Sequence, residues 1–145
     1  LYGVYGHNFV KTILRLASEK KTLKVVADQF GSPTSAADLA ETILIITRQI
    51  ANPNKHLWGT YHYCGAGITS WHGLAEKIIE LAAPYTKLRT CQVQAISTDD
   101  WPTAAPRPPY SVLNCTRLKS QFGIDPQPWQ QSLGHTIERI FSKSR

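Results

Sequence analysis

The proline-rich stretch from Asp99 to Leu113 constrains the fold of this chain more than any other segment. It holds four prolines between residues 102 and 109, with Arg107 among them. Because proline fixes φ and lacks a backbone N–H, this stretch cannot form the interior of a helix or a central strand. Amphipathic, core-forming segments lie on both sides of it, which disfavours a linker between domains.

Arg107 indicates what a stiff loop of this kind is for. The prolines order the backbone in advance, so presenting the arginine to a ligand costs little entropy. A guanidinium binds a phosphate or a carboxylate through two parallel hydrogen bonds. The sequence therefore predicts an anion-binding loop at Arg107, with a purely structural wrap across the surface as the alternative.

The composition is that of one globular domain, and its net charge permits an anionic partner. The chain has 145 residues, of which 42% are hydrophobic and 18% are charged, and its net charge is +6. No apolar run approaches the roughly 18 residues of a membrane-spanning helix, and no signal-peptide pattern opens the chain, so we expect no membrane partner. The basic residues are scattered rather than interleaved with aromatic ones, which disfavours nucleic acid and favours a nucleotide or phosphate ligand.

The cysteines indicate the compartment. Cys64, Cys91 and Cys115 are odd in number, far apart in sequence and without a Cys-x-x-Cys spacing. This pattern argues against a zinc site or a disulfide framework and favours the reducing cytoplasm.

Hydrophobic periodicity predicts an α/β chain in which amphipathic helices are separated by short strands. Asn8, Ser35 and either Thr69 or Ser70 are candidate N-caps, and Gly123 is a candidate C-cap. The predicted helices span residues 9–20, 36–51, the stretch from the Thr69 or Ser70 cap to Pro84, residues 114–122, and the segment after Pro128; the predicted strands span residues 23–26, 59–64 and 91–96. Each strand is too short to build a large sheet alone.

The chain lacks the common catalytic motifs. Its five histidines include no His-Glu-x-x-His pair, and no Gly-x-Ser-x-Gly or Gly-x-Gly-x-x-Gly occurs. The neighbouring carboxylates Asp99 and Asp100 are more typical of a turn than of acid–base chemistry. We therefore expect no catalytic residue and no metal site in this chain.

Three polar loops follow or end near predicted strands, and together they predict a binding site. They are Gly6 to Asn8, Gln29 to Thr34, and the Arg107 loop. A helix N-terminus and an arginine are together suited to a diphosphate. For Asn8 the alternative is a simple helix cap, and for Gln29 it is a turn hydrogen bond.

Several segments together resemble the dTDP-4-dehydrorhamnose reductases. These are Leu-Tyr-Gly-x-x-Gly-x-Asn-Phe-Val-Lys-Thr-Ile-Leu-Arg-Leu (1–16), Val-Val-x-Asp-Gln-x-Gly-Ser-Pro-Thr-x-x-x-Asp-Leu-Ala (25–40), Gly-x-Tyr-His (59–62), Thr-Ser-Trp (69–71) and Pro-Thr-x-Ala-x-Arg-Pro-x-x-Ser-x-Leu (102–113). They occur in the family's order and cover essentially the whole chain.

The resemblance implies an extended short-chain dehydrogenase. In that family an N-terminal Rossmann domain binds NADPH, and a smaller C-terminal domain binds the sugar nucleotide. The enzyme reduces the C4 ketone of dTDP-4-dehydro-L-rhamnose to give dTDP-L-rhamnose, and a Tyr-x-x-x-Lys pair supplies the proton.

This chain contains neither the Tyr-x-x-x-Lys pair nor the glycine-rich fingerprint. By the resemblance we expect residues 1–145 to be the C-terminal substrate-binding domain, with the Rossmann domain and the catalytic residues upstream of Leu1. The resemblance implies that Asn8 and Arg107 bind the nucleotide and its diphosphate, and that Gln29 and Thr34 line the same side.

The resemblance also implies a dTDP-sugar and the chain's own Rossmann domain as partners, and it allows a homodimer. Some family members need Mg²⁺, but no acidic motif in this chain places it. The same pattern occurs in the non-catalytic regulatory subunit of methionine adenosyltransferase. A binding or regulatory module is therefore the alternative to an enzyme.

Overall fold

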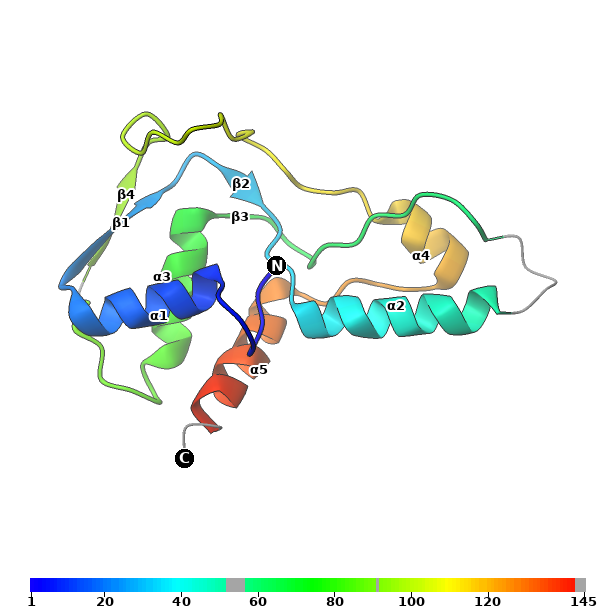
Figure 1. The fold of residues 1–145 in the computed structure, drawn as a ribbon, viewed down its shortest axis with the longest axis horizontal. Helices are drawn as coiled ribbons and strands as arrows, with labels where there is room; N and C mark the ends of the chain where they lie inside the picture. The colour runs from blue at the N-terminus through cyan, green and yellow to red at the C-terminus, as the bar shows by residue number, and fades with distance from the viewer. Residues whose placement is uncertain (52–56, 91, 143–145) are drawn as a thin grey trace.

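The computed structural model describes residues 1–51, 57–90 and 92–142, which contain five helices and four short strands. Figure 1 shows their arrangement. In chain order these are α1 (Phe9–Glu19), β1 (Thr22–Val26), β2 (Phe30–Gly31), α2 (Ala36–Ile50), β3 (Thr69–Ser70), α3 (Trp71–Ala82), β4 (Gln92–Ile96), α4 (Thr116–Phe122) and α5 (Trp129–Ser142). The mixed α/β architecture predicted from the sequence is confirmed.

The helix ends follow the predicted caps. The Asn8 side chain accepts a 3.2 Å hydrogen bond from the Lys11 N–H at the start of α1. Ser35 caps α2 and Ser70 caps α3 in the same way. Gly123 ends α4 at φ 69°, a left-handed conformation that favours glycine.

The strands form two small sheets. β1 and β4 pair in parallel over five residues, from Thr22 opposite Gln92 to Val26 opposite Ile96. β2 and β3 pair antiparallel over two residues, with Phe30 opposite Ser70. The chain between β4 and α4, which carries Arg107, runs across the whole upper side of the molecule in Figure 1. It thereby connects the two ends of the fold.

Two hydrophobic clusters stabilise these two ends. The larger cluster lies between α1, α3, α5 and β1, and Ile78, Leu133 and Ile137 within it are fully buried. The smaller cluster holds Leu118 and Phe122 of α4 against the inner face of α2. Two stretches of the chain, residues 28–34 and residues 63–70, lie between the two clusters at the centre of the fold.

One predicted strand is wrong. Residues 59–64 have the alternating burial of a strand, but they form no ladder with any described strand. The side chains of Tyr61 and Tyr63 instead pack on the smaller cluster, where the ring centroids of Tyr61 and Phe122 lie 4.9 Å apart in an edge-on arrangement. The alternating sequence pattern therefore marks an extended segment that has more and less buried side chains but lacks the backbone pairing that defines a strand.

The remaining differences are small. Helix α4 begins at Thr116 rather than at Asn114, and the two-residue strands β2 and β3 were not predicted. The first residue of the predicted strand 91–96 lies outside the described residues.

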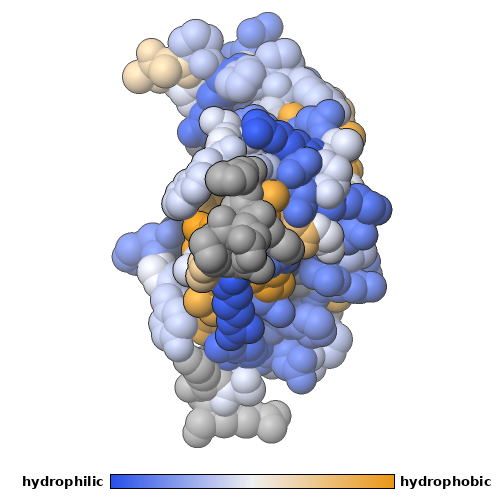
Figure 2. Space-filling view, turned by 90° about the vertical axis from the view of Figure 1, so that its right-hand side faces the viewer, coloured by the Kyte–Doolittle hydropathy of each residue, from blue (hydrophilic) through white to orange (hydrophobic). Residues whose placement is uncertain are grey.

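The surface at the α2–α4 end is mixed in character. Seen from that end, hydrophilic residues surround scattered apolar ones (Figure 2). Ile43 and Leu44 on the outer side of α2 are among the exposed apolar residues. None of the described helices has the length and apolar character needed to cross a membrane.

Candidate functional site

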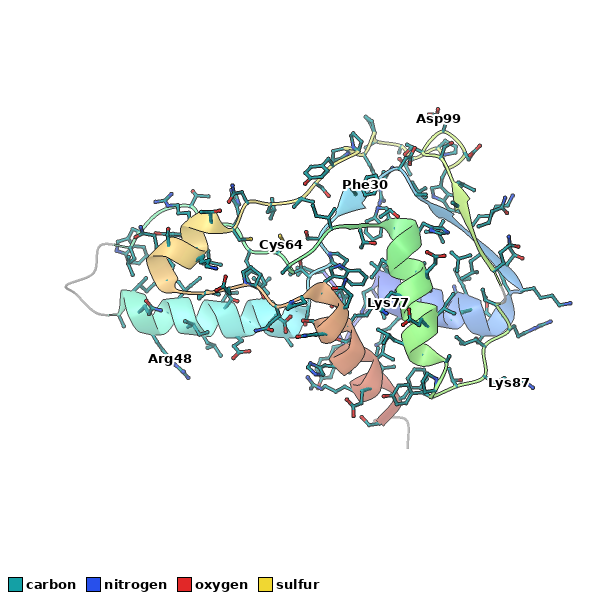
Figure 3. All side chains as sticks on the ribbon, turned by 180° about the vertical axis from the view of Figure 1, so that it is seen from behind. Phe30, Arg48, Cys64, Lys77, Lys87 and Asp99 are labelled. Carbon is teal, nitrogen blue, oxygen red and sulfur yellow. The ribbon has the colours of Figure 1, made fainter. Side chains whose placement is uncertain are left out.

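A cavity of about 490 Å³ lies at the centre of the fold, where four segments of the chain meet. Its wall comes from the chain start, the Gln29–Thr34 segment, the chain from Tyr63 through the start of α3, and the Arg107 loop. Phe30 and Cys64, on two of these segments, lie near the middle of the molecule in Figure 3. The volume is in the range of small-molecule sites.

The strand β2 holds the Arg107 loop in place. The Phe30 N–H donates a 2.8 Å hydrogen bond to the Pro109 carbonyl, and the Ser111 N–H donates a 2.9 Å hydrogen bond to the Phe30 carbonyl. The Ser111 hydroxyl donates a further bond, of 3.2 Å, to the same carbonyl. The proline-rich stretch is therefore anchored directly after Arg107.

Two glycines allow the cavity walls to approach each other. A Cβ atom on Gly31 would lie 2.9 Å from the Ser111 Oγ, and one on Gly65 would lie 2.2 Å from the Pro33 carbonyl oxygen. The second contact involves backbone, which cannot rotate away. Any side chain at residue 65 would therefore push the 63–65 segment away from the Gln29–Thr34 segment.

Arg107 is the one charged side chain among the described residues that line this cavity. It is exposed, and its guanidinium makes no hydrogen bond or ion pair with another described residue. Its donors are consequently available to a ligand. The structure thus places Arg107 at the cavity, and its binding of an anion stays a prediction.

Gln29 is a buried residue of the cavity wall, and its side chain already makes a hydrogen bond within the protein. Its Nε2 donates a 3.1 Å hydrogen bond to the Thr98 hydroxyl, which itself donates to Asp28. Hydrogen bonds from the Thr98 N–H and hydroxyl lower the pKa of Asp28 below its ordinary value of 3.8. This network joins the carboxyl ends of β1 and β4 and fixes Gln29 at the cavity wall.

Thr34 lines the cavity, but its hydroxyl is occupied by the protein. The hydroxyl donates a 3.0 Å hydrogen bond to the Ser32 carbonyl and accepts a 3.1 Å bond from the Gly65 N–H. Thr34 therefore shapes the wall, and a direct contact from its hydroxyl to a ligand stays a prediction.

Asn8 does not lie with the other three residues. It lines a second cavity, of about 360 Å³, which shares Leu1 and Tyr2 with the first. Its Oδ1 caps α1, and its Nδ2 donates a 2.8 Å hydrogen bond to the Gly3 carbonyl. The cap expected as the alternative for Asn8 is present, and a binding role for this residue stays untested.

Aromatic side chains at the cavity were missed as site residues. Phe9 and Trp71 pack with ring centroids 4.8 Å apart, and Trp71 remains 36% exposed and Phe30 43% exposed. Trp71 belongs to the quoted Thr-Ser-Trp motif, which was the available signal for it, whereas Phe30 occupies an unspecified position of the 25–40 motif and had no such signal. Open aromatic faces of this kind suit a flat ring or the apolar face of a sugar.

The cavity is equipped for binding rather than for proton transfer. The described lining includes no histidine, aspartate, glutamate or lysine. Burial raises the pKa of both lining tyrosines, Tyr2 and Tyr63, so these phenols stay protonated at neutral pH. The absence of a catalytic residue from this chain stays a prediction.

The family described as RmlD substrate binding domain matches residues 1–142. The chain is 41% identical to a dTDP-4-dehydrorhamnose reductase from Aggregatibacter actinomycetemcomitans, over 91% of this chain and 45% of the relative. It is 36% identical to one from Burkholderia thailandensis, over 99% of this chain and 50% of the relative. The chain thus spans about half the length of these relatives.

Solved structures agree with the sequence relatives. A dTDP-4-dehydrorhamnose reductase from Bacillus anthracis in complex with NADP superposes with a TM-score of 0.79 at 36% identity, over 95% of this chain and 45% of that one. A reductase of the same description from Clostridium acetobutylicum gives a TM-score of 0.80, also at 36% identity, over 93% and 44%.

Proposed function

The chain belongs to the RmlD substrate-binding domain family, and on that premise we propose that it forms the nucleotide-sugar-binding part of an NADPH-dependent dTDP-4-dehydrorhamnose reductase. The whole protein would reduce dTDP-4-dehydro-L-rhamnose to dTDP-L-rhamnose, a precursor of surface polysaccharides. The observation that carries the proposal is the uncommitted Arg107 guanidinium at a cavity with no other charged side chain among its described lining residues.

In this proposal Arg107 binds the diphosphate of the substrate. The charge-assisted, bidentate bonds of a guanidinium match two phosphate oxygens. The open faces of Phe30 and Trp71 cover the base or the sugar, and the buried Gln29 offers its remaining polar atoms. Asn8 lies at the adjoining cavity. We propose that it contacts the nucleotide only if its side chain gives up the hydrogen bonds to Lys11 and Gly3.

The described residues do not fit a dinucleotide cofactor. They contain no glycine-rich turn from a strand into a helix. First-turn N–H groups of α1, α2 and α3 are already bonded to Asn8, Ser35 and Ser70. We therefore propose that a Rossmann domain outside residues 1–145 holds NADPH and the Tyr-x-x-x-Lys pair. The complex of the Bacillus anthracis relative with NADP supports the choice of cofactor, and this chain covers 45% of that relative.

No Mg²⁺ site is proposed within this chain, because no three histidine, cysteine, aspartate or glutamate side chains gather among the described residues. A Mg²⁺ requirement, a homodimer and a cytoplasmic location stay predictions for the whole protein. The cytoplasmic location rests on the odd number and wide spacing of the cysteines.

A binding or regulatory module is the second candidate. The described lining of the cavity holds no histidine, aspartate, glutamate or lysine, which would suit such a module equally well. The coding sequence upstream of Leu1 distinguishes the two, because an enzyme needs the Tyr-x-x-x-Lys pair and a regulator does not.

The test compares two purified proteins, the whole gene product and residues 1–145. We expect the whole protein to oxidise NADPH in the presence of dTDP-4-dehydro-L-rhamnose, and residues 1–145 alone to oxidise none. Turnover by residues 1–145 would overturn the placement of the catalytic groups. An inactive whole protein that still binds dTDP-L-rhamnose would instead favour the regulatory module.

A further inference from the structure

Two thiols from distant parts of the chain meet at the edge of the cavity. The Sγ atoms of Cys64 and Cys115 lie 3.7 Å apart, although the residues are 51 positions apart in sequence. Both thiols point at one acceptor, the Leu113 carbonyl, at 3.6 Å and 3.9 Å. No motif in the sequence brings these two residues together, so their proximity is a product of the fold.

The two cysteines lie on two different segments next to the cavity. Cys64 is buried in the cavity wall, next to Gly65, whose N–H is bonded to Thr34. Cys115 directly precedes α4 and follows Leu113, a lining residue at the end of the anchored segment after Arg107. A bond between the two sulfurs would join the 63–65 wall to the far end of the Arg107 loop.

We propose that Cys64 and Cys115 are a reversible disulfide site, open as two thiols under reducing conditions and closed by a disulfide oxidant such as oxidised glutathione. Closure requires the sulfurs to approach by about 1.7 Å, to the 2.05 Å of a disulfide. The hydrogen bonds given up on closure are weak ones that involve sulfur: the contact between the two thiols and their bonds to the Leu113 carbonyl.

The exchange proceeds in two balanced steps. Cys115, which is only half-buried, is reached first: its thiolate attacks one sulfur of oxidised glutathione and releases one glutathione thiolate. The buried Cys64 thiolate then attacks the Cys115 sulfur, the protein disulfide forms, and the second glutathione leaves. The two electrons lost by the protein thiols reduce the oxidant, and their two protons pass to solvent and the released thiolates.

The structure also indicates a slow reaction. Burial raises the pKa of the Cys115 thiol, so little of it is thiolate at neutral pH. Excess oxidant and a long incubation compensate for this slow attack in the test below.

The test uses the whole protein, incubated with excess oxidised or reduced glutathione, alkylated, digested without reductant and analysed by mass spectrometry. We expect a peptide pair linked through Cys64 and Cys115 in the oxidised sample only. Cys91→Ser should form the same link, whereas Cys64→Ser and Cys115→Ser should not. Cys115→Ser carries the comparison if the buried substitution at Cys64 prevents folding.

Thermal unfolding provides a second readout. Because the link closes a long loop in the unfolded chain, the Tm of the oxidised wild type should rise by several degrees and return after treatment with dithiothreitol. Stable glutathionylation of Cys115 without a link, a link to Cys91 in its place, or a linked protein with a lower Tm would each overturn the proposal. Formation of the link does not depend on ligand binding, so it can stand even if the proposed function fails.

Discussion

The backbone N–H of Phe30 donates a 2.8 Å hydrogen bond to the carbonyl of Pro109, 79 residues further along the chain. This bond, with the return bond from Ser111 to Phe30, fixes the loop directly after Arg107. A proline-rich stretch provides no ladder of its own, so its position depends on such contacts with β2. The orientation of Arg107 toward the cavity therefore rests on β2.

Gly31→Ala tests that dependence. The new Cβ would lie 2.9 Å from the Ser111 Oγ and displace the hydroxyl that bonds to Phe30. We expect the free energy of unfolding to fall by about 0.5–1.5 kcal/mol. The Gly31→Ala/Ser111→Ala double variant removes the crowded atom, so its loss should be smaller than the sum of the two single losses. Additive losses in chemical denaturation would show that the contact does not exist.

Gly65→Ala should destabilise the fold more than Gly31→Ala does, because its Cβ would lie 2.2 Å from the backbone oxygen of Pro33. We expect a loss of about 2–3 kcal/mol in the free energy of unfolding, as for overpacked sites. Gly134→Ala in α5 is the matched control, since its Cβ meets nothing within 4 Å. The control should be neutral or stabilise the protein by about 0.5–1 kcal/mol. Equal effects of the two substitutions would contradict the close approach at Gly65.

The sequence predicted the helices of this fold better than its strands. Stripes such as Leu74 and Ile78 lie within one helix, and caps such as Asn8 and Ser70 act on the next turn, so both signals are local. The two-residue strand β2 exists because the chain near Pro109 and the chain at Ser70 meet it. Such pairing depends on distant residues and leaves no periodic pattern.

The site was predicted in part for the same reason. Gln29, Thr34 and Arg107 lie around one cavity, as their resemblance to a family motif implied. Asn8 lies at the adjoining cavity, because the capping that made it conspicuous directs its side chain to the helix end. The sequence could not predict that the Thr34 hydroxyl already donates one hydrogen bond and accepts another, since the donor to it, Gly65, is 31 residues away.

The carboxyl group of Asp28 gives a prediction about pH. Hydrogen bonds from Thr98 lower the pKa of Asp28 in the folded protein below 3.8, so the stability they contribute is present above that value. It is lost as the pH falls through the lower, folded-state pKa. Thr98→Val removes the hydroxyl donor and keeps the N–H, so the Asp28 pKa should rise part of the way toward 3.8 in an NMR titration.

Asp100 serves as the internal reference in that titration. Its pKa is lowered chiefly by the Ser97 hydroxyl and N–H, which the Thr98→Val substitution leaves in place. Asp100 should therefore keep its low pKa in the variant. An Asp28 pKa that does not move would refute the role given to the Thr98 hydroxyl.

Trp71 is predicted to contact the ligand through its open ring face. We expect Trp71→Ala to weaken dTDP binding by the whole protein by about 1–3 kcal/mol, the value of one base–aromatic stack, and Trp71→Phe to retain most of the affinity. Trp58→Ala is the control, because Trp58 is 76% exposed and does not line the cavity. Calorimetric titration measures all three. Full affinity in Trp71→Ala would remove this residue from the site.

The measurement that tests the central claim most directly is the affinity of the whole protein for dTDP-L-rhamnose in the wild type, in Arg107→Ala and in Arg48→Ala. Arg48 is also an exposed arginine, but it points away from the body of the molecule on α2 (Figure 3) and does not line the cavity. It therefore controls for the loss of one positive charge.

We expect Arg107→Ala to weaken binding by about 1.5–3 kcal/mol, the value of a charge-assisted hydrogen bond, which is roughly a 10- to 150-fold increase in Kd. Arg48→Ala should leave the Kd within about twofold, because a distant exposed charge is screened by salt. Equal affinity of Arg107→Ala and the wild type, with the fold intact, would contradict the proposal that the Arg107 loop binds the diphosphate.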